Sequence, residues 1–237
     1  MISTIDGALT RFSERIWLTR EPVRPVGMRV HATMTILRLG DGELLLHSPV
    51  AMTASRRAAV EALGTVAHLY APNLYHHRWI GEWAAAFPAA RLHAPPGLAR
   101  KRPELRIDRI TDGATPEPAF AGVLDELTIG GCRLQESVLL YRPERTLLVA
   151  DLVFNIGRPA HRWTRIYSRM TGFYDRVALS SVLRRLAFSD RTAARRSLDA
   201  LLARPFERII VGHGEPVTAQ AREALAAAYA WLLPARD

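Results

Sequence analysis

The chain has 237 residues, of which 49% are hydrophobic and 23% are charged, and its formal net charge at pH 7 is +9. This composition is that of a folded globular protein and excludes a disordered chain. The single cysteine, Cys132, excludes an internal disulfide framework and a thiolate-rich structural zinc site. No run of 18 apolar residues occurs and the first residues lack a signal-peptide core, so we predict a cytoplasmic protein without a transmembrane segment.

The positive charge comes almost entirely from arginine, because Lys101 is the only lysine. The arginines are spread along the chain and form no block of five or six, whereas a nucleic-acid-binding surface requires clustered basic residues. We therefore expect a small-molecule substrate and not nucleic acid. The sequence gives no indication of the oligomeric state.

The first half of the chain alternates predicted strands with short helices. A turn at Gly40-Asp41-Gly42 joins two strands into a hairpin, and Thr53 or Ser55 is placed to cap the first helix. We predict strands within residues 15–23, 28–42, 43–52, 65–72 and 90–96, and helices within residues 53–64 and 76–88.

The second half begins with three successive strands and ends with helices around one more strand. Arg142-Pro143-Glu144 forms the turn between the last two of the three strands, and Pro159 is suited to a first helical turn. We predict strands within residues 121–129, 132–144, 145–155 and 207–216, and helices within residues 159–188, 191–204 and 218–233. The simplest organisation is one domain over residues 1–237, with helices on both faces of a two-sheet core and a helical insertion at about 159–188.

Three segments share one pattern, in which an apolar strand is followed by residues that can bind metal. They are VAHLYAPNLYHH, TLLVADLVFN and RIIVGHGEP, and their candidate ligands are His76 with His77, Asp151 and His213 respectively. Strand-end loops hold functional groups because the rigid strands fix their positions. Histidines with an aspartate are suited to zinc, iron or manganese. The alternatives are a polar helix start for the histidine pair, and turn residues at the other two positions.

The order and spacing of these segments resemble those of the metallo-β-lactamase superfamily. More narrowly, the chain is similar to its uncharacterised DUF4336 branch, in which a PN…HH…W segment replaces the usual His-x-His-x-Asp-His motif. The resemblance covers residues 10 to 230. It implies an α/β (α+β) fold, a four-layer αββα sandwich, with a metal site where strand-end loops meet. His77 matches the last histidine of the motif, His76 its aspartate, Asp151 the metal-bridging carboxylate and His213 the final histidine.

The chain also departs from the superfamily pattern. Pro72 and Leu74 occupy the positions of the first two motif histidines, and neither can bind metal. Glu136 lies where another histidine ligand is usual and can substitute as an oxygen ligand or a general base. Asn73 can hydrogen-bond a substrate or a bound water. We therefore expect one divalent ion and not two, with zinc preferred and iron or manganese as alternatives.

The segment RPAHRWTRIYSRMTGFYDR has helical periodicity and an arginine-rich face. Arg162, Arg165 and Arg169 share this face, and either they form a solvated surface or they bind an anionic substrate. Trp163, Ile166, Met170 and Phe173 fall on another face, which we expect to pack into the core. A membrane-surface role is less favoured, because it requires the aromatic side chains to be exposed.

His47, at the end of another strand, is a further candidate for substrate binding, with a buried structural histidine as the alternative. The function that these observations favour is a metal-dependent hydrolase with a reduced, atypical site, acting on an unknown small substrate, in which Asp151, Glu136 and Asn73 are the candidate catalytic residues. The alternative is a non-catalytic protein of the same fold that binds a small ligand or a protein partner.

Overall fold

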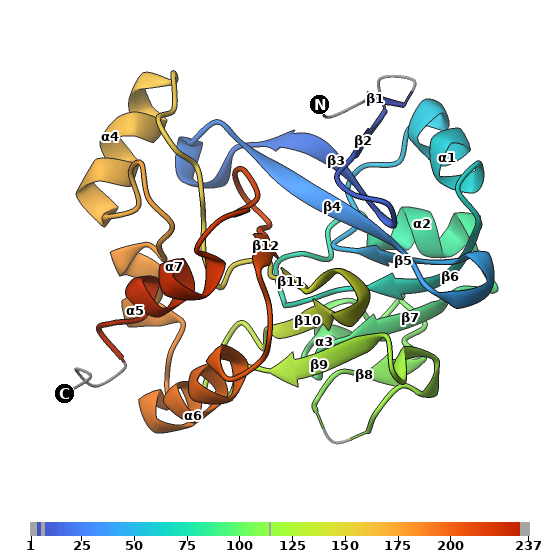
Figure 1. Ribbon diagram of the computed structural model, residues 1–237. Coiled ribbons are helices and arrows are strands. Elements are labelled where there is room, and N and C mark those ends of the chain that lie inside the picture. The colour runs from blue at the N-terminus through green and yellow to red at the C-terminus, as the bar shows by residue number, and fades with distance from the viewer. Residues whose placement is uncertain (1–3, 6–7, 114, 233–237) are drawn as a thin grey trace. The chain divides into compact units, whose positions relative to one another are not determined.

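The computed structural model describes residues 4–5, 8–113 and 115–232 (Figure 1). The chain forms two compact units. Unit 1 comprises Met1–Glu21 and Ala32–Thr111, and unit 2 comprises Pro22–His31 and Asp112–Asp237. Within the described residues, no helix combines the length and the apolar character needed to cross a bilayer.

Unit 1 is built on an eight-stranded sheet whose strands follow one another in chain order. β4 and β5 form the predicted hairpin, with a 3-10 turn at Gly40–Gly42, and from β5 onward the strands pair in parallel. The strands are β1 (Thr4–Ile5), β2 (Leu9–Arg11), β3 (Ile16–Val23), β4 (Val30–Arg38), β5 (Glu43–His47), β6 (Thr65–Tyr70), β7 (Arg91–Ala94) and β8 (Arg109–Ile110).

The parallel strands of unit 1 are connected by helices, as crossover connections require. Helix α1 (Ala54–Glu61) begins where the sequence predicts, because the Thr53 hydroxyl accepts a hydrogen bond from the Arg56 amide at 3.1 Å. Helix α2 (Ile80–Ala86) follows β6, and α3 (Leu98–Lys101) follows β7. The loop between β6 and α2 contains the histidine pair.

Unit 2 contains a four-stranded sheet in the order β12-β11-β10-β9. The three successive strands predicted from the sequence pair antiparallel, and β12 joins the edge in parallel to β11. The elements are β9 (Leu124–Thr128), β10 (Ser137–Tyr141), β11 (Thr146–Leu148), α4 (Arg162–Thr171), α5 (Ser181–Leu186), α6 (Arg191–Leu202), β12 (Arg208–Ile210) and α7 (Ala221–Ala228). One apolar core connects this sheet to the surrounding helices.

The helical stretch expected over residues 159–188 is two separate helices. The α4 helix begins after His161, whose side chain accepts from the Thr164 amide, so Pro159 lies before the helix and not in its first turn. Gly172 ends α4 in the left-handed conformation with φ of 85°, which glycine adopts without a steric penalty. The Ser180 side chain then caps α5. Hydrophobic periodicity alone does not reveal this interruption.

Of the apolar residues expected to pack into the core, Phe173 is buried just after α4, whereas Trp163, Ile166 and Met170 on the helix are exposed. The side chains buried on this helix are Thr164, Ser168 and Thr171, whereas Trp163 and Met170 are exposed. The Thr164 hydroxyl accepts from the Arg29 amide at 2.9 Å, and the Ser168 and Thr171 hydroxyls donate to carbonyls of the preceding turn. The hydroxyl groups on the buried face of α4 therefore all form hydrogen bonds with nearby backbone groups.

Candidate metal centre

The parallel pairing of β11 with β12 brings two predicted ligands of unit 2 together. Leu148 pairs with Ile210, and beyond this pair both chain segments continue in the same direction to one edge of the sheet. Asp151 follows one strand and His213 follows the other. His213 Nε2 lies 3.6 Å from the Asp151 Oδ1 atom, and both side chains are largely buried. Asp151 and His213, which are 62 positions apart in the sequence, therefore form one polar pair.

The hydrogen bond of His213 determines which of its nitrogens carries a proton. Nδ1 lies 2.8 Å from the backbone carbonyl oxygen of His31. A carbonyl oxygen only accepts, so Nδ1 must donate, and in the neutral ring Nε2 then presents a lone pair. A metal-binding histidine commonly donates its second N–H to a carbonyl or a carboxylate in this way.

The His213 backbone is fixed by close contacts on its C-terminal side. Gly214 has φ of 108°, and a Cβ atom placed there would lie 2.0 Å from the Asn155 carbonyl oxygen. The Asn155 amide donates to the His213 carbonyl at 3.1 Å, and the Phe154 ring packs edge-on against the imidazole at 5.6 Å. Close approach of the Asn155 backbone thus requires glycine at position 214, next to His213.

Glu136 holds the loop that carries Asp151. Its carboxylate accepts hydrogen bonds from the amides of Ala150, Asp151 and Leu152 at 2.9, 3.0 and 3.1 Å, and the side chain is buried. Three charge-assisted bonds to consecutive amides fix the loop firmly. Burial and the negative charge of Glu136 together raise the pKa of the neighbouring Cys132 thiol to about 11. The arrangement is that of a positioning residue behind Asp151.

The pair formed by Asp151 and His213 fits a divalent cation chemically. A neutral imidazole lone pair and a carboxylate oxygen, both buried and facing one another, repel unless a proton or a cation lies between them. Imidazole nitrogen with carboxylate oxygen is a donor set used for zinc, iron and manganese. These two residues could therefore hold a metal ion, with further ligands needed to complete the coordination.

In unit 1, the loop after β6 orients His76 through two polar neighbours. The Asn73 side-chain oxygen accepts from the amides of Tyr75 and His76, both at 2.8 Å, so this buried asparagine organises the turn. The Ser48 hydroxyl lies 2.7 Å from His76 Nδ1. Because Nδ1 is engaged, the outward ring nitrogen of His76 is Nε2, the atom through which a histidine most simply binds metal.

His77 lies in a different electrostatic environment from His76. Arg102 donates to His77 Nδ1 at 3.2 Å. Burial, followed by the positive charges of Lys101 and Arg102, lowers the pKa of His77. The same charges oppose the approach of a metal cation. Of the two predicted unit 1 ligands, His76 is electrostatically the better one.

His47 is fully buried, and its Nε2 atom has no hydrogen-bond partner within the described part of the chain. Burial, with a smaller contribution from His76, lowers its pKa to about 3, and its ring stacks on Tyr70 at 5.7 Å. The imidazole is therefore neutral at physiological pH. It thus provides no positive charge that could attract an anionic substrate.

The three arginines of the predicted anion-binding face are exposed on α4. Within the described residues, Arg162 and Arg165 form no ion pair, and Arg169 packs its guanidinium over the Tyr174 ring at 4.4 Å. The described contacts do not join any of the three to Asp151 or His213.

Three contributors to the site were not identified from the sequence. Ser48, which contacts His76, has φ of 56°, unusual for a residue other than glycine. The carbonyl of His31 acts through its backbone, for which no side-chain pattern exists. Arg102 lies 25 residues beyond His77 in the sequence, without a motif that links them.

Known structures provide an independent comparison for this architecture. No protein-family model and no curated protein sequence matches the chain. A metallo-β-lactamase from Pontibacter korlensis superposes with a TM-score of 0.65 at 14% identity, covering 94% of this chain and 97% of that one. The DIM-1 metallo-β-lactamase gives a TM-score of 0.64 at 13% identity, covering 94% of this chain and 95% of that one.

The FIM-1 metallo-β-lactamase of Pseudomonas aeruginosa, crystallised in a mono-zinc form, gives a TM-score of 0.62 at 14% identity over 96% of both chains. At these identities the likeness shows the fold. The predicted α/β architecture, two sheets with helices of metallo-β-lactamase type, is confirmed.

Proposed function

We propose that this protein is a metal-dependent hydrolase with a reduced site that uses one divalent ion, preferably zinc. Asp151 and His213 are the ligands assigned from unit 2, and His76 is preferred over His77 as the ligand predicted from unit 1. A small, anionic substrate, a cytoplasmic location and membership of the DUF4336 branch also remain predictions from the sequence.

The observation that carries the proposal is the fixed tautomer of His213. The largely buried imidazole of His213 donates from Nδ1 to the His31 carbonyl, which leaves the Nε2 lone pair 3.6 Å from the Asp151 carboxylate. The fold, and a neighbour described in its mono-zinc form, support the same assignment. Pro72 and Leu74, in place of two motif histidines, support one ion over two.

The residues of the chain would divide the work of hydrolysis. A bound ion would lower the pKa of a coordinated water towards ~7 and polarise a substrate oxygen. His213 stays correctly oriented because the His31 carbonyl holds its Nδ1 proton. Glu136 fixes the Asp151 loop, and the second Asp151 oxygen can accept a proton from the attacking water. Asn73 keeps the turn before His76 in place.

Metal content of purified variants tests the proposal. Protein prepared without chelators should contain about one zinc per chain. Asp151→Asn and His213→Asn should each lose it, since each removes one of few ligands. Glu136→Gln should weaken zinc binding by roughly 10- to 100-fold, the usual effect of disturbing a residue that orients a ligand. Elemental analysis and competition with a chromophoric chelator provide the measurements.

Asp199→Asn is the matched control, because Asp199 is an exposed carboxylate on α6. Its zinc content should equal that of the parent. His76→Ala and His77→Ala identify the third ligand, with the larger loss expected for His76. Unchanged zinc stoichiometry in Asp151→Asn would refute the metal site.

A second candidate function is non-catalytic binding of a small ligand on the same scaffold. The two missing motif histidines favour it, because a site with fewer protein ligands binds a metal ion more weakly. Zinc-loaded protein that fails to hydrolyse a panel of generic esters, thioesters and phosphoesters would support the binder over the hydrolase.

A further inference from the structure

Helix α4 presents its apolar side chains outward. Trp163, Ile166 and Met170 follow one another at helical spacing and are 44%, 41% and 75% exposed. The Trp163 indole donates to the carbonyl of Val26 at 3.0 Å, and Val26 is itself exposed, so the two segments form one patch. A row of this kind on a soluble chain marks an interaction surface.

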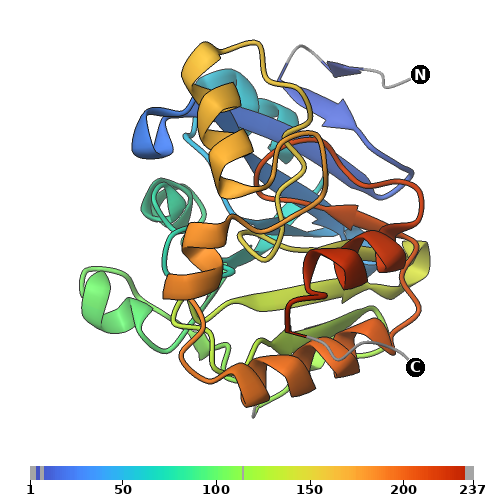
Figure 2. The ribbon, with the colours of Figure 1, turned by 90° about the vertical axis from the view of Figure 1, so that its left-hand side faces the viewer.

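The same side of unit 2 continues into α5. Figures 1 and 2 both place α5 beyond the end of α4 along the side that faces the viewer in Figure 2. This second helix exposes Val182 and Leu186. We refer to the exposed side chains of Val26, α4 and α5 as the α4–α5 face.

Arginines lie beside the apolar row on both helices. Arg162, Arg165 and Arg169 occupy the neighbouring face of α4, and Arg184 and Arg185 lie on α5. Within the described part of the chain, none of the five forms an ion pair with a carboxylate. The long aliphatic stems of these residues can lie along an apolar layer while the guanidinium groups reach polar phosphates.

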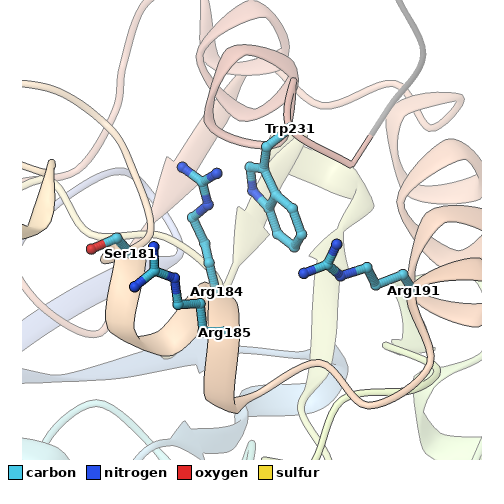
Figure 3. Close-up of a pocket in the computed structure, with 5 residues that line it drawn as sticks. All are labelled: Ser181, Arg184, Arg185, Arg191 and Trp231. Carbon is cyan, nitrogen blue, oxygen red and sulfur yellow. The ribbon is translucent and has the colours of Figure 1, made fainter.

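A cavity of about 230 Å³ opens next to α5 and is lined by Ser181, Arg184, Arg185, Arg191 and Trp231 (Figure 3). The Trp231 ring lies between the side chains of Arg184 and Arg191, whose guanidinium carbons are 4.9 and 5.6 Å from its centroid. The indole N–H is buried and has no acceptor among the residues that the structure describes.

Apart from the Ser181 hydroxyl, the polar side-chain groups of the residues that line this cavity are all hydrogen-bond donors. A buried donor without an acceptor is costly, and clustered guanidinium groups match the oxygens of a phosphate. The chemistry of the cavity therefore selects a ligand rich in anionic oxygen.

We propose that the α4–α5 face docks on an anionic phospholipid surface, with the apolar row entering the interface and the cavity accepting a lipid phosphate. Amphipathic helices with arginine on one face and tryptophan on the other lie in this way at bilayer surfaces. A second copy of the chain fits the face poorly, because two chains of charge +9 would bring their arginines together. Binding to nucleic acid alone would leave the apolar row without a function.

Co-sedimentation with vesicles tests the proposal. The parent protein should bind vesicles of phosphatidylglycerol with phosphatidylcholine and should not bind pure phosphatidylcholine. Arg165→Ala with Arg169→Ala should weaken partitioning about 30-fold, since each basic residue near an anionic surface contributes about 5-fold. Ile166→Ser with Met170→Ser should also weaken it, and this loss should persist in high salt.

Two further variants separate the contribution of the cavity to vesicle binding from the contribution of total charge. Trp231→Phe keeps the ring and removes the unpaired N–H, so it should reduce vesicle binding less than the α4 double variants. Arg195→Ala with Arg196→Ala removes the same charge from α6, at the other end of unit 2 in both views, and should bind like the parent. Each variant is first shown to unfold at the parental temperature.

Three outcomes would overturn the docking proposal. If the parent ignores anionic vesicles, the face does not bind lipid. If the α6 control loses as much binding as the α4 variants, only net charge matters. If inorganic pyrophosphate stabilises the protein through Trp231 while vesicles do not bind, the cavity is a site for soluble anions. Zinc content should be the same in every arm, so the result is independent of the hydrolase proposal.

Discussion

Among single residues, Gly214 is the one on which the presentation of His213 depends most directly. Its φ of 108° lies where side-chain-bearing residues are strained, and a Cβ would collide with the Asn155 carbonyl. This carbonyl also accepts from the Glu215 amide at 2.8 Å, so it is not able to move away without losing a hydrogen bond. The positive φ angle and the close approach of the Asn155 carbonyl together exclude any residue other than glycine at position 214.

Gly214→Ala should therefore lower both stability and zinc affinity. We expect a loss of roughly 3 kcal/mol or more in the free energy of unfolding, because strain and a backbone collision add. Gly157→Ala is the matched control. Gly157 has φ of 65° and open space around it, so only about 1 kcal/mol is expected. Urea denaturation measures both variants, and equal losses would contradict the collision.

The candidate site residues that the sequence predicted are those whose side chains follow a recognisable strand. Asp151 and His213 each come after an apolar run, and the structure joins them at 3.6 Å. Ser48 and the carbonyl of His31 escaped notice because a rare φ angle and a backbone acceptor leave no mark in residue identities. Whether His76 and Asn73 act with them stays a prediction.

At the scale of elements, α4 shows why periodicity predicts a helix better than its orientation. A helix with one apolar and one arginine-rich face is expected to bury the apolar face. Here a third face, made of Thr164, Ser168 and Thr171, is small enough to pack and satisfies its own hydroxyl groups. The sequence pattern is the same in both orientations, so only the tertiary contacts decide between them.

Two substitutions on α4 test this orientation. Thr164→Val keeps the shape but removes the oxygen that accepts from the Arg29 amide, so it should cost roughly 1–3 kcal/mol. Met170→Ala, at an exposed position, should change stability by less than about 0.5 kcal/mol. If Met170→Ala proves the more damaging of the two, the apolar face packs into the core after all.

For the molecule as a whole, two buried histidines in unit 1 make the free energy of unfolding depend on pH. Burial is the main cause that lowers the pKa of both His47 and His93 to about 3, from an ordinary value of 6.5. His93 also lies 2.9 Å from His68, between their ring nitrogens. Since the folded-state pKa lies below the unfolded value, the unfolded chain takes up these protons first as the pH falls.

Stability should therefore be full above pH 6.5 and fall between about pH 6.5 and 3. Each of the two histidines contributes a slope of up to about 1.4 kcal/mol per pH unit in this range. His47→Phe removes one titrating group and keeps a buried ring, so its stability should decline with about half the combined slope of the parent. Urea denaturation at a series of pH values provides the measurement, and parallel curves for parent and variant would exclude the linkage.

The fold was predictable further than the site, because strand and helix patterns extend over long segments. The predicted hairpin at Gly40–Gly42 and the helix capped by Thr53 are confirmed. The short strands β1, β2 and β8 and the helix α3 were missed, since two to four residues carry too little periodicity. The prediction of a single domain over the whole chain is not tested by these structural observations.

The parallel contact between β11 and β12 also sets when the centre can exist during protein synthesis. β12 and His213 follow α4, α5 and α6 in the chain, so a ribosome must translate these three helices after Asp151 before both residues of the pair are present. A nascent or prematurely terminated polypeptide then carries Asp151 without its partner. The carboxylate and the imidazole accordingly pair only after the segment through His213 has been translated.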